Sequence, residues 1–232
     1  MNREQQKTVV AAMLMLPLFV FIGAAEPALG QTTTDERVWT AVSVQGRAGA
    51  DSPWRWASES LVRSRDGGST LDFLAEQVMV TRSLTRQTAV GIGYAYLWAF
   101  PQNGSLREHR FVQQYTWSHG VNLRTSVRSR VEERFVTGHP ALLRARQQVR
   151  LTWPLAARGA LQAVASEELF LQAGFTALTP PGLDSNHVFV GVRRTLTRRS
   201  AMEIGYVNVY TRTGPNRHLR SHVMSATLAV GL

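Results

Sequence analysis

The chain has 232 residues, no cysteine and a formal net charge of +10, so disulfide bonds and cysteine metal sites are excluded. After the amino-terminal leader, no segment reaches the ~20 consecutive apolar residues that a membrane-spanning helix needs. Lys7 is the only lysine, and the arginines alternate along extended segments instead of clustering. This distribution argues against a nucleic-acid-binding protein.

The first thirty residues predict an export signal. Arg3 and Lys7 precede an apolar run from Val9 to Ala25, and small residues follow at 28–30. This is the pattern of a secretory signal peptide, whose small residues are read by a signal peptidase. We expect cleavage before Gln31, which leaves one domain over residues 31–232. An uncleaved anchor is the alternative, although the short and proline-interrupted core favours cleavage.

Eleven segments in the remaining chain show the period of two that indicates β-strands. Most are about twice the usual strand length of about five to six residues. Polar turns separate consecutive segments, which predicts an antiparallel meander that closes into a barrel. Because single-chain bacterial barrels have an even number of strands, we expect ten or twelve in total. The segments are Val38–Gln45, Trp54–Arg65, Leu71–Arg82, Thr88–Phe100, Leu106–Ser118, Val121–Val136, Leu142–Trp153, Ala160–Gln172, Asn186–Leu196, Ala201–Arg212 and His218–Leu232.

The predicted connections alternate in length. Short turns are expected at 83–87, 119–120, 154–159 and 197–200, and longer loops at 101–105, 137–141, 173–185 and 213–217. Short turns on one side and long loops on the other are typical of outer-membrane barrels, whose short turns face the periplasm. The segment 173–185 contains two prolines and a glycine, so we expect an exposed external loop there.

The segment from Val121 to Phe135 indicates which face of the strands points toward lipid and which points into the lumen. Valine, leucine and phenylalanine alternate with four arginines, and the segment 142–153 repeats the pattern. A soluble barrel would put the apolar face inside, whereas a membrane barrel puts it outside. With the arginines on the lipid side, the first segment alone would lose on the order of 5–12 kcal/mol, at about 2–4 kcal/mol for each arginine near the midplane. We therefore expect the arginines in the lumen.

Three further features favour the membrane. A ring of ten or twelve strands has a wide interior that long charged side chains fill better than an apolar lining. The segment Thr88–Phe100 gathers aromatic residues on one face against glycine and alanine on the other, as an interfacial aromatic girdle requires. The sequence ends within an alternating segment, which resembles the recognition signal of the outer-membrane assembly machinery, although Leu232 replaces the usual phenylalanine.

The charged face predicts the candidate site. Opposed side chains on neighbouring strands lie within about 5 Å of each other, so the inward arginines should form one basic wall, and a ring of arginines selects anions. This predicts an anion passage or a site for a phosphate-bearing ligand; the alternative is a structural ion-pair network that closes the lumen. The arginines are Arg110, Arg124, Arg128, Arg130, Arg134, Arg144, Arg146 and Arg150, and the acidic partners of matching parity are Glu108, Glu132 and Glu168.

We predict no catalytic residues. Ser118 and His119 are adjacent and point to opposite faces, and His222 differs in parity from Ser221 and Ser225. Neither arrangement gives the serine–histidine pair of a nucleophilic hydrolase. The sequence has no phosphate-cradling glycine loop and no metal-ligand spacing, so we expect no cofactor and no metal. Tryptophans 54, 56, 98, 117 and 153 lie near predicted strand ends, where an aromatic belt is the ordinary explanation and a ligand platform the alternative.

Several short motifs carry a resemblance to a known family. They are Trp39-Thr40-Ala41-Val42, the run 107–115 (REHRFVQQY), Glu132-Glu133-Arg134-Phe135, Leu143-Arg144-Ala145-Arg146, Glu167-Glu168-Leu169-Phe170 and Glu203-Ile204-Gly205-Tyr206. In this order and spacing the chain resembles the bacterial domain-of-unknown-function family 2490, which is expected to form outer-membrane β-barrels. The resemblance covers nearly the whole mature chain and implies fold and location, but no activity.

The sequence thus predicts an all-β, antiparallel up-and-down transmembrane barrel of ten to twelve strands in the bacterial outer membrane. We expect a non-enzymatic pore or structural envelope protein. Its expected partners are outer-membrane lipid, lipopolysaccharide and, during biogenesis, the barrel assembly machinery. Two alternatives stay open: an outer-membrane lipid-modifying hydrolase, and a soluble periplasmic barrel that binds an apolar ligand.

Overall fold

The computed structural model describes residues 31–101, 104–156, 160–173, 181–214 and 217–232. The predicted export signal lies outside these residues. A short 3-10 turn, η1 (Asp66–Gly68), joins the second and third strands, and no helix in the described ranges is long and apolar enough to cross a membrane. The strands are β1 (Gln31–Arg47), β2 (Trp54–Arg65), β3 (Thr70–Ser83), β4 (Thr88–Ala99), β5 (Leu106–His119), β6 (Arg124–Val136), β7 (Leu142–Pro154), β8 (Leu161–Ala173), β9 (Gly182–Thr195), β10 (Ser200–Gly214) and β11 (Arg217–Gly231).

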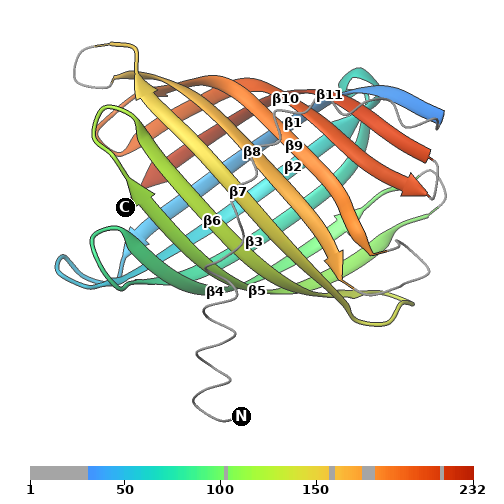
Figure 1. Ribbon diagram of the computed structural model, residues 1–232, viewed down its shortest axis with the longest axis horizontal. Helices are drawn as coiled ribbons and strands as arrows, with labels where there is room; N and C mark the ends of the chain where they lie inside the picture. Colours follow the sequence, from blue (N-terminus) through green and yellow to red (C-terminus); the bar gives the residue numbers. More distant parts are fainter. Residues whose placement is uncertain (1–30, 102–103, 157–159, 174–180, 215–216) are drawn as a thin grey trace, which may run out of the picture. The chain divides into compact units, whose positions relative to one another are not determined.

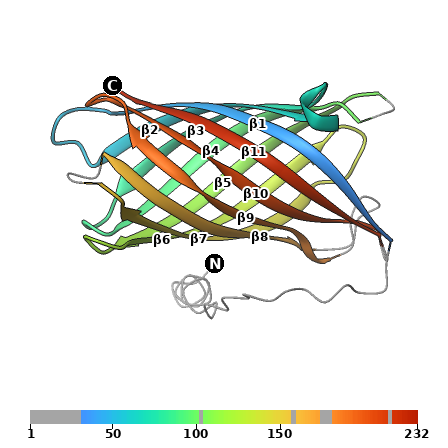
Figure 2. The same ribbon diagram turned by 90° about the horizontal axis from the view of Figure 1, so that it is seen from above.

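These eleven strands form one closed barrel (Figures 1 and 2). Each strand pairs antiparallel with its neighbours in the chain, and β1 pairs parallel with β11 to close the ring. The antiparallel barrel and the range of ten to twelve strands are confirmed, but the expectation of an even number is wrong. When strand directions alternate, the first and eleventh run the same way, so an odd barrel closes only through a parallel pair.

The parallel closure also puts the start of β1 and the finish of β11 at opposite ends of the barrel (Figure 2). We call these the N-terminal end and the C-terminal end. The turns 48–53, 84–87, 120–123 and 196–199 lie at the C-terminal end, and the connections 66–69 and 137–141 lie at the N-terminal end.

The predicted alternation between short turns and long loops is wrong. The two sets of connections have similar lengths except at 174–181, because β9 begins at Gly182 and β10 continues to Gly214, further than the sequence pattern indicated. Most of the expected external loop at 173–185 falls outside the described residues. Loop length therefore does not tell which end of the barrel faces the periplasm.

The predicted segments agree closely with the strands, and the main differences have local causes. β1 begins seven residues earlier than predicted because its polar first residues pair in register with β11, starting at Gln31 opposite Arg217. β6 begins at Arg124 instead of Val121 because Gly120 turns the chain at φ +100°. A Cβ at that position would lie 2.0 Å from the carbonyl oxygen of Leu123.

The two walls of the barrel differ as the alternation predicted. The outer wall is rich in exposed apolar side chains: Ile92 is 69% exposed, Met224 57% and Phe111 54%. On the inner wall, Glu132 is 1% exposed and Val223 is fully buried. Trp54, Trp56, Trp117 and Trp153 lie near the C-terminal end and Trp98 near the N-terminal end, as an aromatic belt requires.

The outer wall also carries hydrogen-bonded polar groups. Ser58 and Ser60 on β2 both donate to the carboxylate of Glu76 on β3. Asn186 donates to Glu167 across β8 and β9, at 3.0 Å. These carboxylates face outward from interior positions of their strands, and neutral groups satisfy them.

Glycines on the inner wall make room for large neighbours. A Cβ on Gly93 would lie 2.0 Å from the sulfur of Met79. Gly191 and Gly205 face each other across β9 and β10, and the ring of Phe189 lies against both of them. On the inner face of β4, Gly93 thus leaves room for the side chain of Met79.

Candidate functional site

The registers of β5, β6 and β7 place the predicted arginines on one wall. Arg110 is opposite Arg134, and Arg130 is opposite Arg146. Because partners in register share a face, all eight arginines point toward the lumen, together with the three predicted glutamates. The structure therefore brings the predicted set together. Their role as an anion site stays a prediction.

Glu132 is the centre of this set. Arg144 donates to one carboxylate oxygen of Glu132 through Nε at 2.9 Å and Nη2 at 2.5 Å. Arg146 donates to the other oxygen at 2.6 Å, and Arg110 lies 4.0 Å away. A carboxylate removed from water in this way needs such paired donors, because an unpaired buried charge is very costly.

The other two glutamates extend the network on both sides. Glu108 accepts from Arg110 at 2.5 Å and from Arg134 at 2.6 Å. Glu168 accepts from Arg128 at 3.1 Å and from Arg146 at 3.0 Å. We call these three glutamates and five arginines the ion-pair layer. Its members come from β5, β6, β7 and β8.

Aromatic and apolar residues pack beside the ion-pair layer in the lumen. The guanidinium of Arg63 lies 3.9 Å from the ring centre of Trp39, and that of Arg146 lies 4.5 Å from the ring of Phe170. The ring of His187 packs between Phe170 and Trp39. On β10 and β11, Val207, Val209 and Val223 join Trp39 in a buried cluster. The rings of Phe170 and His187 thus connect the ion-pair layer to this cluster.

Several charged residues of the lumen were not anticipated as site residues. Arg37 donates to Asp35 at 2.7 Å and to Asp72 at 2.8 Å, nearer the N-terminal end. Glu203 on β10 accepts from Arg150 at 3.1 Å. Glu203 shares the inner wall with Arg193, its register partner on β9. Parity along β10 was the signal that could have identified Glu203.

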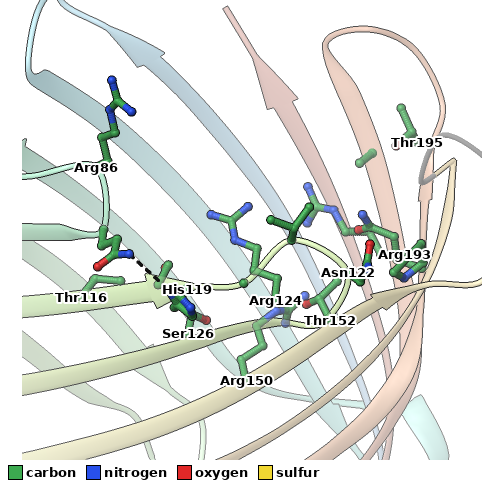
Figure 3. A pocket seen from close by; sticks show the side chains of 17 residues that line it. Arg86, Thr116, His119, Asn122, Arg124, Ser126, Arg150, Thr152, Arg193 and Thr195 are labelled. Carbon is green, nitrogen blue, oxygen red and sulfur yellow. Dashed lines mark hydrogen bonds between the residues drawn. The ribbon is translucent and has the colours of Figure 1, made fainter.

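The C-terminal half of the lumen is hollow. A cavity of about 1270 Å³ opens at this end (Figure 3), and we call it the basic cavity. A second cavity of about 860 Å³ adjoins it, and Thr116 lines both. The lining of the basic cavity comprises Arg86, Gln87, Thr116, Ser118, His119, Gly120, Val121, Asn122, Arg124, Ser126, Arg150, Thr152, Pro154, Gln162, Arg193, Thr195 and Ala201.

The eight predicted arginines therefore do not form a uniform basic wall. Five form ion pairs with the three glutamates of the ion-pair layer. Arg130 donates to the amide oxygen of Gln114 at 2.7 Å, and Arg150 pairs with Glu203. Arg124 is exposed at the cavity and has no ion-pair partner among the described residues. The alternation in the sequence identified the arginines of the inner wall. It did not show which of them would pair with a carboxylate.

The structure shows the hydrogen-bond partners of the serines and histidines. No hydrogen bond joins a serine hydroxyl to a histidine ring in the described part of the chain. Three histidines on the outer wall instead pair with tyrosines; one is His222, whose Nδ1 shares a hydrogen bond with the hydroxyl of Tyr206 at 2.5 Å. The described residues contain no group of three or more potential metal ligands. That the protein is not an enzyme stays a prediction.

Comparison with known proteins identifies the family. The family model described as a protein of unknown function (DUF2490) matches residues 36–220, and the chain belongs to this family. An uncharacterized protein of Methylorubrum extorquens is 27% identical over 94% of this chain and 96% of its own length. The structure titled LpxR from Salmonella typhimurium superimposes with a TM-score of 0.47 and 9% identity, covering 76% of this chain and 83% of that one. A likeness at this level carries no inference, so the assignment of the fold rests on the strand pairing and the family.

Proposed function

We propose that this protein is an integral outer-membrane barrel whose lumen is closed by the ion-pair layer, and that it acts as a structural envelope protein and not as a through-pore. The 1% exposure of Glu132, deep inside the ring, carries the proposal. A wall that conducts ions must leave its charged groups accessible to water, whereas Glu132 is buried in ion pairs with Arg144 and Arg146.

The outer wall supports membrane insertion. Its strands have 12 to 17 residues, more than the ~9–11 needed to cross a bilayer when tilted. Exposed valine, isoleucine and phenylalanine side chains cover the outer wall, and tryptophans lie toward both ends. Lipid acyl chains are the natural surroundings of such a surface. We therefore propose outer-membrane lipid and lipopolysaccharide as its surroundings, the assembly machinery as its partner in biogenesis, and cleavage of the export signal before Gln31.

A charged lumen does not support the alternative of a soluble barrel that binds an apolar ligand. Such a protein needs an apolar lining around an internal cavity. Here the inner wall holds the ion-pair layer, and arginines line the cavities. Among the described residues, no contact specifically favours the lipid-hydrolase alternative over the structural role.

Two measurements test the proposal. Cell fractionation should recover the protein in the outer-membrane pellet, with a mobility on gels that shifts on heating; recovery in the soluble fraction would contradict membrane insertion. In planar bilayers the purified barrel should give no channel openings under conditions in which a porin control conducts. Steady, concentration-dependent openings of the wild-type protein would show that the lumen is a pore.

A further inference from the structure

The basic cavity has an unusual charge distribution. Arg86, Arg124, Arg150 and Arg193 line it, and no aspartate or glutamate is among its lining residues. The four arginines come from separate elements: the turn between β3 and β4, and strands β6, β7 and β9. Figure 3 shows Arg124, Arg150 and Arg193 gathered around the cavity, with Arg86 across from them.

One carboxylate behind the lining holds two of these arginines in place. Glu203 accepts from both terminal nitrogens of Arg150 and lies 3.9 Å from Nη1 of Arg193. The two arginine side chains remain 25% and 35% exposed. One carboxylate neutralises only one guanidinium, so this trio keeps a net positive charge and a fixed geometry.

The other two arginines have no such counterion. Neither Arg86 nor Arg124 has an ion-pair partner among the described residues, and both are exposed. The local charge of the four arginines with Glu203 is therefore +3. Like charges repel within a Debye length of about 8–10 Å, and an anion in their midst would relieve that repulsion.

Neutral hydrogen-bond donors complete the lining. The hydroxyls of Ser126 and Thr152 and the amides of Asn122 and Gln162 face the same space. None of these four side chains makes a hydrogen bond to another described residue. Guanidinium forks with hydroxyl and amide donors are the combination that binds phosphate and carboxylate oxygens.

We propose that the basic cavity binds a ligand with two or more phosphate or carboxylate groups, which enters from the C-terminal end of the barrel. The volume of about 1270 Å³ exceeds the usual range of about 300–1,000 Å³ for small-molecule sites. It therefore suits an organic phosphate better than a lone inorganic ion. This proposal goes beyond the structural role and does not depend on it.

The test uses the full-length protein purified in a zwitterionic detergent, with pyrophosphate as the probe and calorimetry at low salt as the measurement. We expect saturable binding to the wild-type protein that weakens steeply in 1 M NaCl. The double variant Arg124→Gln/Arg193→Gln should lower the affinity at least tenfold. Arg194→Gln removes one positive charge from the outer wall, next to Arg193, and should change the affinity less than twofold; the single variant Arg193→Gln is its matched comparison.

A second arm distinguishes two sources of the same chemistry. Short-chain cardiolipin in the micelle presents two phosphate groups on one lipid. If this lipid binds and pyrophosphate does not, and the double variant abolishes the binding, the cavity takes its phosphate from a lipid headgroup. Heat-dependent mobility on gels confirms that each variant is folded. Absence of saturable binding by both probes, or an equal loss in Arg194→Gln, would overturn the proposal.

Discussion

The carboxylates of the inner wall and those of the outer wall are satisfied in different ways. On the inner wall, Glu132 and Glu168 each accept from two arginines. On the outer wall, Glu76 accepts from two serine hydroxyls, and Glu167 accepts from the amide of Asn186. One barrel thus uses ionic donors inside and neutral donors outside.

This difference follows from the surroundings of each wall. Within a closed lumen, several guanidinium groups can converge on one carboxylate, which offsets the cost of removing all the charges from water. An arginine on a lipid-facing wall costs about 2–4 kcal/mol near the midplane, and Asp or Glu costs less. Neutral donors satisfy an outward carboxylate without adding a second charge to lipid. The contrast predicts that the two walls respond oppositely to the same kind of substitution.

The largest effect is expected on the inner wall, at the centre of the ion-pair layer. Glu132→Gln leaves Arg144 and Arg146 buried without their shared countercharge. Removal of one partner from a buried pair costs about 3–5 kcal/mol, so the free energy of unfolding should fall by that amount in urea titrations of the barrel in vesicles. Glu59→Gln, on the inner wall beside the second cavity, should stay within about 0.5 kcal/mol of wild type. Equal losses in both variants would remove the distinction between the closed and hollow halves.

Much of this inner wall follows from the sequence, because the period of two fixes which side chains share a face. Parity alone placed Glu108, Glu132 and Glu168 with the arginines of β5, β6 and β7. Parity does not give the height of a residue in the barrel, since height depends on strand tilt and on the register between distant strands. For that reason the sequence did not separate Arg144, which is buried in the ion-pair layer, from Arg124, which is exposed at the cavity.

The pairing that closes the barrel could not be predicted from the sequence for a related reason. The first residues of β1 are polar and show no clear alternation, so no pattern in them indicates that they pair with β11. That pairing is parallel and joins the two ends of the domain, and no local pattern encodes so distant a contact. The basic cavity was equally hidden, because Arg86 and Arg193 reach it from elements far apart in the chain.

The outer wall provides the next largest effect. Met224 is 57% exposed near the middle of β11, and Met224→Arg should lower the free energy of unfolding in bilayers by about 2–4 kcal/mol. Val230→Arg, on the same strand and wall but at its C-terminal end, should cost about 0–1 kcal/mol. Equal costs at the two depths, measured by urea titration in vesicles, would contradict a lipid-facing outer wall.

A smaller loss in the free energy of unfolding is expected at Gly205, where the inner wall is closely packed and carries no charge. In Gly205→Ala the new Cβ would lie 2.5 Å from Cε2 of Phe189 and 2.4 Å from the carbonyl oxygen of Val190. Overpacking of this kind costs about 1–3 kcal/mol. A second substitution, Phe189→Leu, should recover part of the loss, because the two residues are in contact and their effects are not additive. Gly231→Ala is the control, since its Cβ would make only an ordinary contact at 3.6 Å, and a similar loss there would point to a general intolerance of alanine.

The smallest effect is expected to be an increase in the free energy of unfolding, opposite in sign to the other three. It comes from making the same substitution on both walls. Glu76→Leu removes an outward carboxylate and leaves two serine hydroxyls that can rotate toward backbone oxygens. In lipid, the loss of the charged group should raise the free energy of unfolding by about 1 kcal/mol, because Asp and Glu on this face cost less than arginine but still destabilise. Glu59→Leu makes the same change on the inner wall beside the water-accessible cavity, where no charge leaves lipid and no gain is expected. Urea titrations of both variants in vesicles and in detergent provide the measurement. A stabilised Glu59→Leu beside a destabilised Glu76→Leu would mean that the outer carboxylate is held in water or by a partner, and the assignment of the outer wall to lipid would have to be given up.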